Sequence, residues 1–494
     1  MKARVLAAVL LAWFFAPATF GAEPAKQPNV LFICVDDLKP LLGCYGQASV
    51  KTPNIDRLAA KSVRFDAAYC NQAVCAPSRN ALLTGLRPTR IGIYDLPTFF
   101  REGAKPDAVT MPQLFMQQGW RTTSLGKIFH VGHGNHSDPA SWSTPAWRPQ
   151  APMYALRAGG SAANKGPAVE SADVPDETFS DGLIAKEAIQ RLQDAKQKPA
   201  EPFFLMVGFN RPHLPFVAPK KYWDLYDPKS FQPEENQAAP TGAPAYAPTK
   251  WPELRGYTDI PKTGDLDADL QRTLIHGYRA ATSYMDAQVG KVLDELDGLD
   301  LASNTIIVFW GDHGYHLGDH GMWCKHTNYE QATRIPLMMR VPGMSKNAGV
   351  FKGLVESVDV YPTMCEVMGV TAPQGLDGKS FAAALKDPNG APKEVVAFQV
   401  FPRTAKESGK GWLLGRAVRT DRYRLVEWKK PGAAADTAEI ELYDFQTDPG
   451  ETKNVAADQP DVVAKLRAIL VEQGEALPQV KATGKATSAP ASGE

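Results

Sequence analysis

Three unbroken apolar runs stand out along the chain. They are NVLFICV (29–35), PFFLMVGF (202–209) and TIIVFWG (305–311), and polar residues follow each of them. Runs that are apolar at every position, rather than at alternate positions, are typical of strands buried on both faces of a parallel sheet. We therefore expect three buried, parallel strands.

Helical patterns alternate with these strands. Residues 52–65 begin with Thr-Pro-Asn and indicate a short helix, and residues 111–130 indicate a helix, a break at Gly119 and then a strand. Residues 267–299 form the longest stretch with helical spacing of apolar positions. Strands that alternate with helices predict an α/β fold with a large doubly wound sheet, in which ligands bind at the carboxyl ends of the strands.

The pattern changes near the C-terminus. Residues 416–428 and 439–445 alternate between apolar and polar positions, as half-exposed antiparallel strands do, and residues 461–477 read as a helix. We expect a large domain over residues 23–375 and a smaller α+β subdomain with an antiparallel sheet over residues 376–478. The last residues, 479–494, are predicted to form a disordered tail of low complexity.

Two long segments interrupt the large domain. Residues 140–176 and 232–265 are rich in Pro, Gly and Ala and carry no clear periodicity. Such segments are typical of surface loops, and loops of this length often serve function. We expect them to form walls of a substrate pocket.

The N-terminus resembles an export signal. Lys2 and Arg4 precede an apolar stretch from Val5 to Phe15, and small residues follow it. This order is typical of a cleaved signal peptide over residues 1–22, and the alternative is an uncleaved anchor. The apolar stretch is shorter than the roughly 20 residues that span a bilayer. We expect a secreted or periplasmic protein without stable membrane insertion.

Composition narrows the range of partners. The 54 Lys and Arg residues balance the 54 Asp and Glu residues, so no overall field favours nucleic acid. A polyanionic partner would have to be held by a local basic patch. The six cysteines match neither zinc-site spacing nor a small disulfide scaffold, and no pattern favours a particular oligomeric state.

The stretch CAPSR contains the most unusual cysteine of the chain. Cys75 lies two residues before Pro77 and four before Arg79, and Gly85 follows as a typical helix stop. At a helix N-terminal cap, Cys75 would lie where an anion is favoured. A capped helix with an incidental cysteine is the alternative, because the spacing arises by chance in about one such chain in forty.

Acidic residues follow two of the predicted strands. Asp36 and Asp37 come after the first strand, and Asp312 and His313 come after the third. Taken singly, each carboxylate could cap a helix. Converging at one sheet edge, they would repel each other unless a cation held them, and oxygen ligands select Ca²⁺ or Mg²⁺ over zinc.

Together these motifs resemble the type I sulfatases of the alkaline phosphatase-like superfamily. The stretches that carry the resemblance are, in family order, NVLFICVDD, CAPSR…LLTG, GKIFH, RPHLPF, GDHGYHLGDHG and LYDFQTDPGETKNV. VDDLKPLLGCYG, YMDAQVGKVLDELDGL and NYEQATRIPL point further to the iduronate-2-sulfatase branch. The resemblance spans residues 28–370 well and is weaker beyond. It implies a large mixed sheet flanked by helices.

The resemblance also implies a nucleophile. A maturation enzyme would oxidise Cys75 to Cα-formylglycine on the unfolded chain. One hydroxyl of the hydrated aldehyde attacks sulfur and releases the alcohol. The second hydroxyl then loses its proton and sulfate departs.

Further roles follow from the matched motifs. The implied ligands of one Ca²⁺, with Mg²⁺ as the alternative, are Asp36, Asp37, modified Cys75, Asp312 and His313. His313 could instead donate a hydrogen bond to the nucleophile.

The implied catalytic residues surround the sulfate ester. Arg79 and Lys127 would neutralise sulfate oxygens, and His130 would take the proton in the elimination step. His213 would hold or protonate the leaving oxygen, and Lys325 would contact the sulfate or the ester oxygen. Tyr94 and Asp95 would contact the sugar.

The function expected from these residues is an exported sulfatase. Its substrate would be a sulfated carbohydrate, with a uronate 2-sulfate of a polysaccharide or oligosaccharide as the specific hypothesis. One alternative keeps the fold but hydrolyses phosphate or phosphonate esters. Another is a sulfated-glycan binding protein in which Cys75 stays a thiol.

Overall fold

The computed structural model describes residues 27–156, 166–344, 348–390 and 396–481. The predicted signal peptide, residues 1–22, and most of the predicted tail lie outside these ranges. Within the described part of the chain, no helix is both long enough and apolar enough to cross a bilayer. None of the six cysteines forms a disulfide.

A seven-stranded mixed sheet forms the centre of the molecule. In spatial order its strands are β3 (Arg121–Gly126), β5 (Phe203–Phe209), β1 (Asn29–Val35), β7 (Thr305–Gly311), β8 (Arg334–Arg340), β2 (Val63–Tyr69) and β9 (Gly349–Glu356). The first four run parallel to one another, β8 runs antiparallel to both of its neighbours, and β9 is parallel to β2. The three predicted parallel strands are confirmed as β1, β5 and β7.

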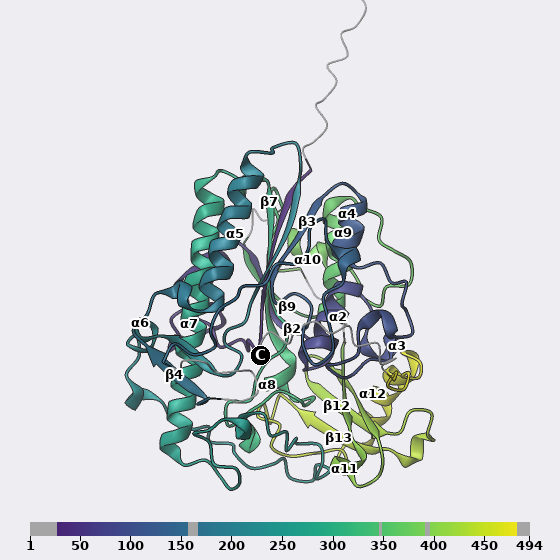
Figure 1. Cartoon of the computed structure of the whole chain (residues 1–494). Coiled ribbons are helices and arrows are strands. Elements are labelled where there is room, and N and C mark those ends of the chain that lie inside the picture. Colours follow the sequence, from purple (N-terminus) through teal and green to yellow (C-terminus); the bar gives the residue numbers. More distant parts are fainter. Residues whose placement is uncertain (1–26, 157–165, 345–347, 391–395, 482–494) are drawn as a thin grey trace, which may run out of the picture.

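Both faces of the sheet are covered, which explains the unbroken apolar runs. In β1, Val30, Phe32 and Cys34 belong to the core on one face, and the alternate residues belong to the core on the other. Helices α5 and α7, with α1, cover one face, and α2, α4, α9 and α10 cover the other (Figure 1). The predicted doubly wound architecture is therefore confirmed.

The helices have the following bounds. They are α1 (Pro53–Ala59), α2 (Cys75–Thr84), α3 (Pro88–Ile91), α4 (Met111–Gln117), α5 (Ser180–Lys196), α6 (Lys220–Trp223), α7 (Ala268–Gly298), α8 (Glu330–Thr333), α9 (Val360–Met368), α10 (Ala382–Lys386), α11 (Ala405–Ser408) and α12 (Pro460–Glu472). The longest, α7, begins where the sequence indicates, because the Asp267 side chain accepts a hydrogen bond from the amide of Leu270.

A second, antiparallel sheet lies beside the carboxyl end of the large one (Figure 1). Its strands, in order, are β10 (Ala397–Arg403), β11 (Leu413–Arg419), β12 (Tyr423–Lys429) and β13 (Glu439–Asp444), and α12 packs on it. The predicted C-terminal antiparallel sheet is confirmed. The boundary at residue 376 stays a prediction; Phe381 and Leu385 pack with the core of the large sheet.

One pair of strands was not predicted from the sequence. The segment 140–176, expected to be a loop, contains β4 (Val169–Ala172), which pairs in parallel with β6 (Phe216–Pro219). Four residues are too few to show a period, and the partner strand lies more than 40 residues away in the chain. The pairing is therefore visible only in the tertiary structure.

Buried ion pairs join the two sheets. Arg424 of β12 is fully buried, and its guanidinium donates to Glu330 at 2.8 Å and to Glu451 at 2.5 Å. Glu330 begins α8, which leads directly into β8 of the large sheet. Arg424 thus fastens the small sheet to the large domain.

We predict that Arg424→Met lowers the free energy of unfolding by about 3–5 kcal/mol, because removing one partner leaves buried carboxylates without compensation. Denaturant unfolding of the full chain measures the loss. Arg422→Met is the matched control: Arg422 pairs with Asp444 at the surface, and its loss should change stability little. Equal stability of the two variants would contradict the prediction.

Candidate active site

Four neighbouring parallel strands deliver polar residues to one edge of the large sheet. Asp36 and Asp37 follow β1, Asp312 and His313 follow β7, and Lys127 follows β3. His213 lies four residues beyond the end of β5. Because β3, β5, β1 and β7 are adjacent and parallel, their carboxyl ends gather these side chains in one place, as the sequence predicted.

Helix α2 presents Cys75 to this edge. The cysteine is the first residue of the helix, and Val74 occupies the N-cap position, so the expectation that Cys75 itself is the cap was wrong by one residue. The helix ends at Gly85, whose φ of 68° is the left-handed stop that the sequence indicated. Cys75 still lies in the first turn, among the unpaired amides of the helix N-terminus.

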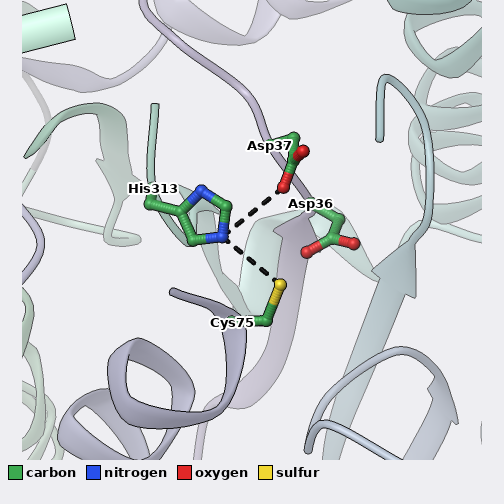
Figure 2. A group of neighbouring side chains, drawn as sticks. All are labelled: Asp36, Asp37, Cys75 and His313. Atoms are coloured by element: carbon green, nitrogen blue, oxygen red, sulfur yellow. Dashed lines mark hydrogen bonds and ion pairs between the residues drawn. The ribbon is translucent and has the colours of Figure 1, made fainter. Parts of the chain in front are cut away.

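Four buried side chains converge at the start of α2. Asp36, Asp37, Cys75 and His313 each offer a ligand atom, and these atoms lie within 4.8 Å of one another (Figure 2). The Nε2 atom of His313 lies 3.4 Å from Cys75 Sγ and 3.4 Å from Asp37 Oδ1. Both contacts are drawn in Figure 2.

These four residues fit a cation. The Nδ1–H of His313 donates to the carbonyl of Gly314 at 3.0 Å, which leaves the Nε2 lone pair facing Asp37. Burial, followed by the charge of Lys325, lowers the pKa of His313 to about 3, so the ring is neutral. Asp37 Oδ1 is buried and has no hydrogen-bond partner among the described residues. A positive ion bound between these two acceptor atoms would satisfy both of them.

Asp312 holds the backbone of two of these four residues in place. Its Oδ1 accepts from the backbone amides of Asp37 at 3.0 Å and His313 at 2.8 Å. Asp37 adopts a left-handed φ of 56°, which Asp tolerates better than most residues, and the bond to Asp312 holds it there. Asp312 lies outside the four converging residues, so its role as a metal ligand stays a prediction.

Arg79 joins two of the carboxylates. It is fully buried; Nε donates to Asp312 Oδ2 at 3.0 Å and Nη2 donates to Asp36 Oδ1 at 3.1 Å. Nη1 donates to the carbonyls of Lys127 and Ile128. The guanidinium therefore acts on the protein rather than facing an open pocket. These contacts position Asp36 and Asp312, and the implied role of Arg79 towards sulfate oxygens stays a prediction.

Two buried lysines balance the remaining charge. Lys127 Nζ lies 2.7 Å from Asp36 Oδ2, and Lys325 Nζ lies 3.0 Å from Asp37 Oδ2. Burial alone would raise the pKa of Asp36, but Lys127 and Arg79 hold it well below its usual value. Burial raises the pKa of Asp37 to about 8 even though Lys325 opposes the shift. Of these two carboxylates, Asp37 is the one whose charge the lysines compensate less, so a bound cation would stabilise it more than Asp36.

His213 and Lys325 form a second contact. Lys325 Nζ lies 3.3 Å from His213 Nε2, while His213 Nδ1 donates to the carbonyl of Leu214 at 2.6 Å. Burial and the charge of Lys325 lower the pKa of His213 well below its usual value, so Nε2 is unprotonated and accepts a hydrogen bond from the Lys325 ammonium. Burial alone would lower the pKa of Lys325, but Asp37 and Glu253 raise it well above its usual value, so the ammonium holds its proton firmly. Which of them protonates a leaving group stays a prediction.

Glu253 is a site residue that the sequence missed. Its Oε1 lies 2.9 Å from Lys325 Nζ and 3.6 Å from His213 Nε2. It belongs to the 232–265 insertion, which was expected to form a pocket wall. The only signal for it was the predicted role of that loop, because Glu253 follows no strand and belongs to no recognised motif.

The remaining candidates differ in their surroundings. His130 is buried, its Nε2 lies 3.2 Å from His133 Nδ1, and the two rings stack. Tyr94 is buried, and its hydroxyl donates to the carbonyl of Leu477 at 2.6 Å, so this side chain holds the C-terminal segment; its contact with the sugar stays a prediction. Asp95 accepts from the amide of Thr98, and its sugar contact stays a prediction.

Family comparisons agree with this geometry. The family described as Sulfatase matches residues 28–370, and the family described as N-sulphoglucosamine sulphohydrolase, C-terminal, matches residues 318–476. The chain is 36% identical to iduronate 2-sulfatase of Mus musculus over 514 aligned residues, which cover 89% of this chain and 93% of that protein.

Solved structures share the fold. A protein in complex with its substrate D-glucosamine-2-N,6-O-disulfate superposes with a TM-score of 0.72 at 23% identity, covering 91% of this chain and 97% of that one. The phosphonate monoester hydrolase of Agrobacterium radiobacter superposes with a TM-score of 0.71 at 21% identity, covering 91% and 96%. At these identities the likeness shows the fold alone.

We predict that Arg79→Met destabilises the folded chain by about 3–5 kcal/mol, because Asp36 and Asp312 lose their shared buried partner. Arg79→Lys should recover only part of the lost stability, since the single ammonium of lysine cannot bridge two carboxylates as the planar guanidinium does. Denaturant unfolding in a Cys75→Ser background measures this with the chemistry of residue 75 held constant. Unchanged stability in Arg79→Met would mean that Arg79 does not brace the site.

Proposed function

The chain belongs to the sulfatase family of sulfuric ester hydrolases, and from this premise we propose that it removes sulfate from a carbohydrate, specifically a uronate 2-sulfate. One observation carries the proposal: Cys75 of the C-x-P-x-R motif opens α2 with Sγ beside His313 and the carboxylates of Asp36 and Asp37. The substrate class rests on the extended similarity to iduronate 2-sulfatase.

Cys75 is proposed to be converted to formylglycine by a maturation enzyme, the one protein partner that the function requires. The hydrated aldehyde supplies an oxygen nucleophile that can later be released from sulfate by elimination. The surrounding residues prepare its position. The first turn of α2 fixes residue 75, and the Ser78 hydroxyl donates to the carbonyl of Asp312, which ties the helix to the end of β7.

A divalent cation, Ca²⁺ rather than Mg²⁺, is proposed to bind among Asp36, Asp37, His313 and modified Cys75, with Asp312 beside them. It supplies positive charge next to the nucleophile and the sulfate oxygens. Arg79 keeps Asp36 and Asp312 in place for it. His313 either binds the ion through Nε2 or holds the nucleophile by a hydrogen bond.

The other residues are proposed to bind the sulfate group and to transfer protons during hydrolysis of the ester. Lys127 is proposed to hold sulfate oxygens, and His130, three residues further on, to take the proton in the elimination step. Lys325 and His213 face the leaving oxygen together. His213 is proposed to hold or protonate this oxygen, and Lys325 to contact it or the sulfate; in the resting site the Lys325 ammonium donates a hydrogen bond to His213 Nε2.

The alternatives carry less support. Phosphonate monoester hydrolases share the fold at 21% identity, whereas the family match and the 36% identical relative both point to sulfate esters. Parallel assays on sulfate and phosphate esters separate the two. A binding protein without turnover would require Cys75 to remain a thiol. Export to the periplasm or medium is proposed from the N-terminal signal pattern.

We predict that protein made together with a maturation enzyme carries formylglycine at position 75, so its peptide is lighter by about 18 Da than the thiol form. Mass spectrometry of the tryptic peptide ending at Arg79 measures this. Cys75→Ser should keep the fold and lose nearly all turnover, because a serine lacks the elimination route. Full activity of Cys75→Ala would contradict the proposed mechanism.

We predict that a chelator abolishes hydrolysis of 4-nitrophenyl sulfate, and that Ca²⁺ restores it better than Zn²⁺ because the ligands are mainly hard oxygen atoms. Asp37→Asn should lose bound calcium and activity together, measured by elemental analysis and by rate. Asp265→Asn, which changes an exposed carboxylate, is the matched control. Full activity of the wild type in chelator would show that the acidic group binds no essential ion.

A further inference from the structure

The 232–265 insertion brings one acidic side chain to the open side of the site. Glu253 and His213 keep 13% and 21% of their side chains exposed, whereas Lys325 keeps 4% and Asp37 none. Glu253 and His213 therefore lie between the buried charges and solvent.

Glu253 contacts Lys325 and His213 and is not among the residues that converge with Cys75. Its carboxylate converges with Asp37 and His213 instead. If sulfur faces residue 75 and the leaving oxygen faces Lys325 and His213, the next atoms of the substrate face Glu253. This step rests on the proposed function.

One oxygen of Glu253 has no partner. Oε1 is used by Lys325, but Oε2 is buried and accepts no hydrogen bond from any described residue. A carboxylate only accepts hydrogen bonds, and a buried acceptor without a donor is costly. A hydrogen-bond donor such as a substrate hydroxyl would satisfy this oxygen, whereas an anion would be repelled.

An exposed aromatic ring lies two residues before Glu253. Trp251 keeps 48% of its surface exposed, and its ring packs on His326 with centroids 4.5 Å apart. His326 follows Lys325 directly and is itself buried. A large exposed indole anchored beside a polar acceptor offers an apolar face to a sugar ring.

The insertion is held firmly against the rest of the site. Arg403 of β10 is buried and donates to the carbonyls of Tyr246 and Ala247 in the insertion, at 2.7 and 2.8 Å. The same guanidinium donates to the carbonyl of His326 at 3.0 Å. One arginine thus fixes the insertion and the Lys325–His326 segment relative to each other, so Trp251 and Glu253 are positioned rather than loose.

We propose that Glu253 and Trp251 form the sugar-recognition subsite, in which Glu253 Oε2 accepts a hydrogen bond from the hydroxyl on the carbon next to the sulfated carbon. Trp251 supports the ring from its apolar face. The subsite selects sugars with an unsubstituted hydroxyl there and disfavours a second sulfate or a carboxylate at that position.

The test compares two substrates in protein that carries formylglycine and Ca²⁺. One is the methyl glycoside of a 2-sulfated uronate, and the other is its 3-deoxy analogue. A hydrogen bond to a charged group predicts that wild type prefers the hydroxylated compound by about 10- to 100-fold in kcat/KM. In Glu253→Ala the preference should fall to about one, whatever the absolute rates, because the ratio cancels any effect on Lys325.

Glu235→Ala, which removes an exposed carboxylate on the same insertion, is the matched control and should keep the wild-type preference. Trp251→Ala should raise KM for both compounds by about 3- to 10-fold and keep the preference. An unchanged KM would overturn the role of Trp251.

Two outcomes would overturn the role of Glu253 while the proposed function stands. One is a wild type that hydrolyses both compounds equally well, and the other is a Glu253→Ala protein that keeps the preference. A wild type that carries formylglycine and hydrolyses neither compound would instead overturn the proposed function, and this inference with it.

Discussion

Mutual repulsion among buried carboxylates is the constraint on which the rest of this structure depends. Asp36, Asp37 and Asp312 are fully buried at one sheet edge. Ionising all three there would cost a prohibitive amount of free energy without nearby positive charge. Arg79 and the two lysines supply part of that charge from separate elements. The orphaned oxygen of Asp37 and the lone pair of His313 mark where the remainder, a cation, fits.

The fold provides this arrangement through a simple topological fact. Four adjacent parallel strands all end at the same edge, so residues far apart in the chain meet there; Asp37 and Asp312, for example, are 275 positions apart. Helix α2 adds Cys75 to the same place and is fastened by Ser78 and Arg79. The nucleophile candidate and the charges that serve it are thus held by the core itself.

The smaller sheet contributes more than stability. Arg403 of β10 links the insertion to the segment that carries Lys325, and Arg424 of β12 fixes α8 just beyond it. Because Lys325 contacts Asp37, His213 and Glu253 at once, its position joins the metal-binding group to the substrate side. The open side of the site is therefore built from parts of both sheets.

The sequence by itself determined the buried strands, α2 with its stop at Gly85, the antiparallel C-terminal sheet and the gathering of Asp36, Asp37, Lys127 and His313. Each of these features follows from a local pattern or from the point where a strand ends. Local patterns and strand ends can be predicted without knowing which distant segments pack against them. Only the tertiary structure decided that Arg79 faces carboxylates, that Tyr94 binds the C-terminal segment, and that Glu253 reaches Lys325. These contacts join segments 43 to 383 residues apart. No periodicity records which side chain meets a distant one, because that depends on how the elements pack.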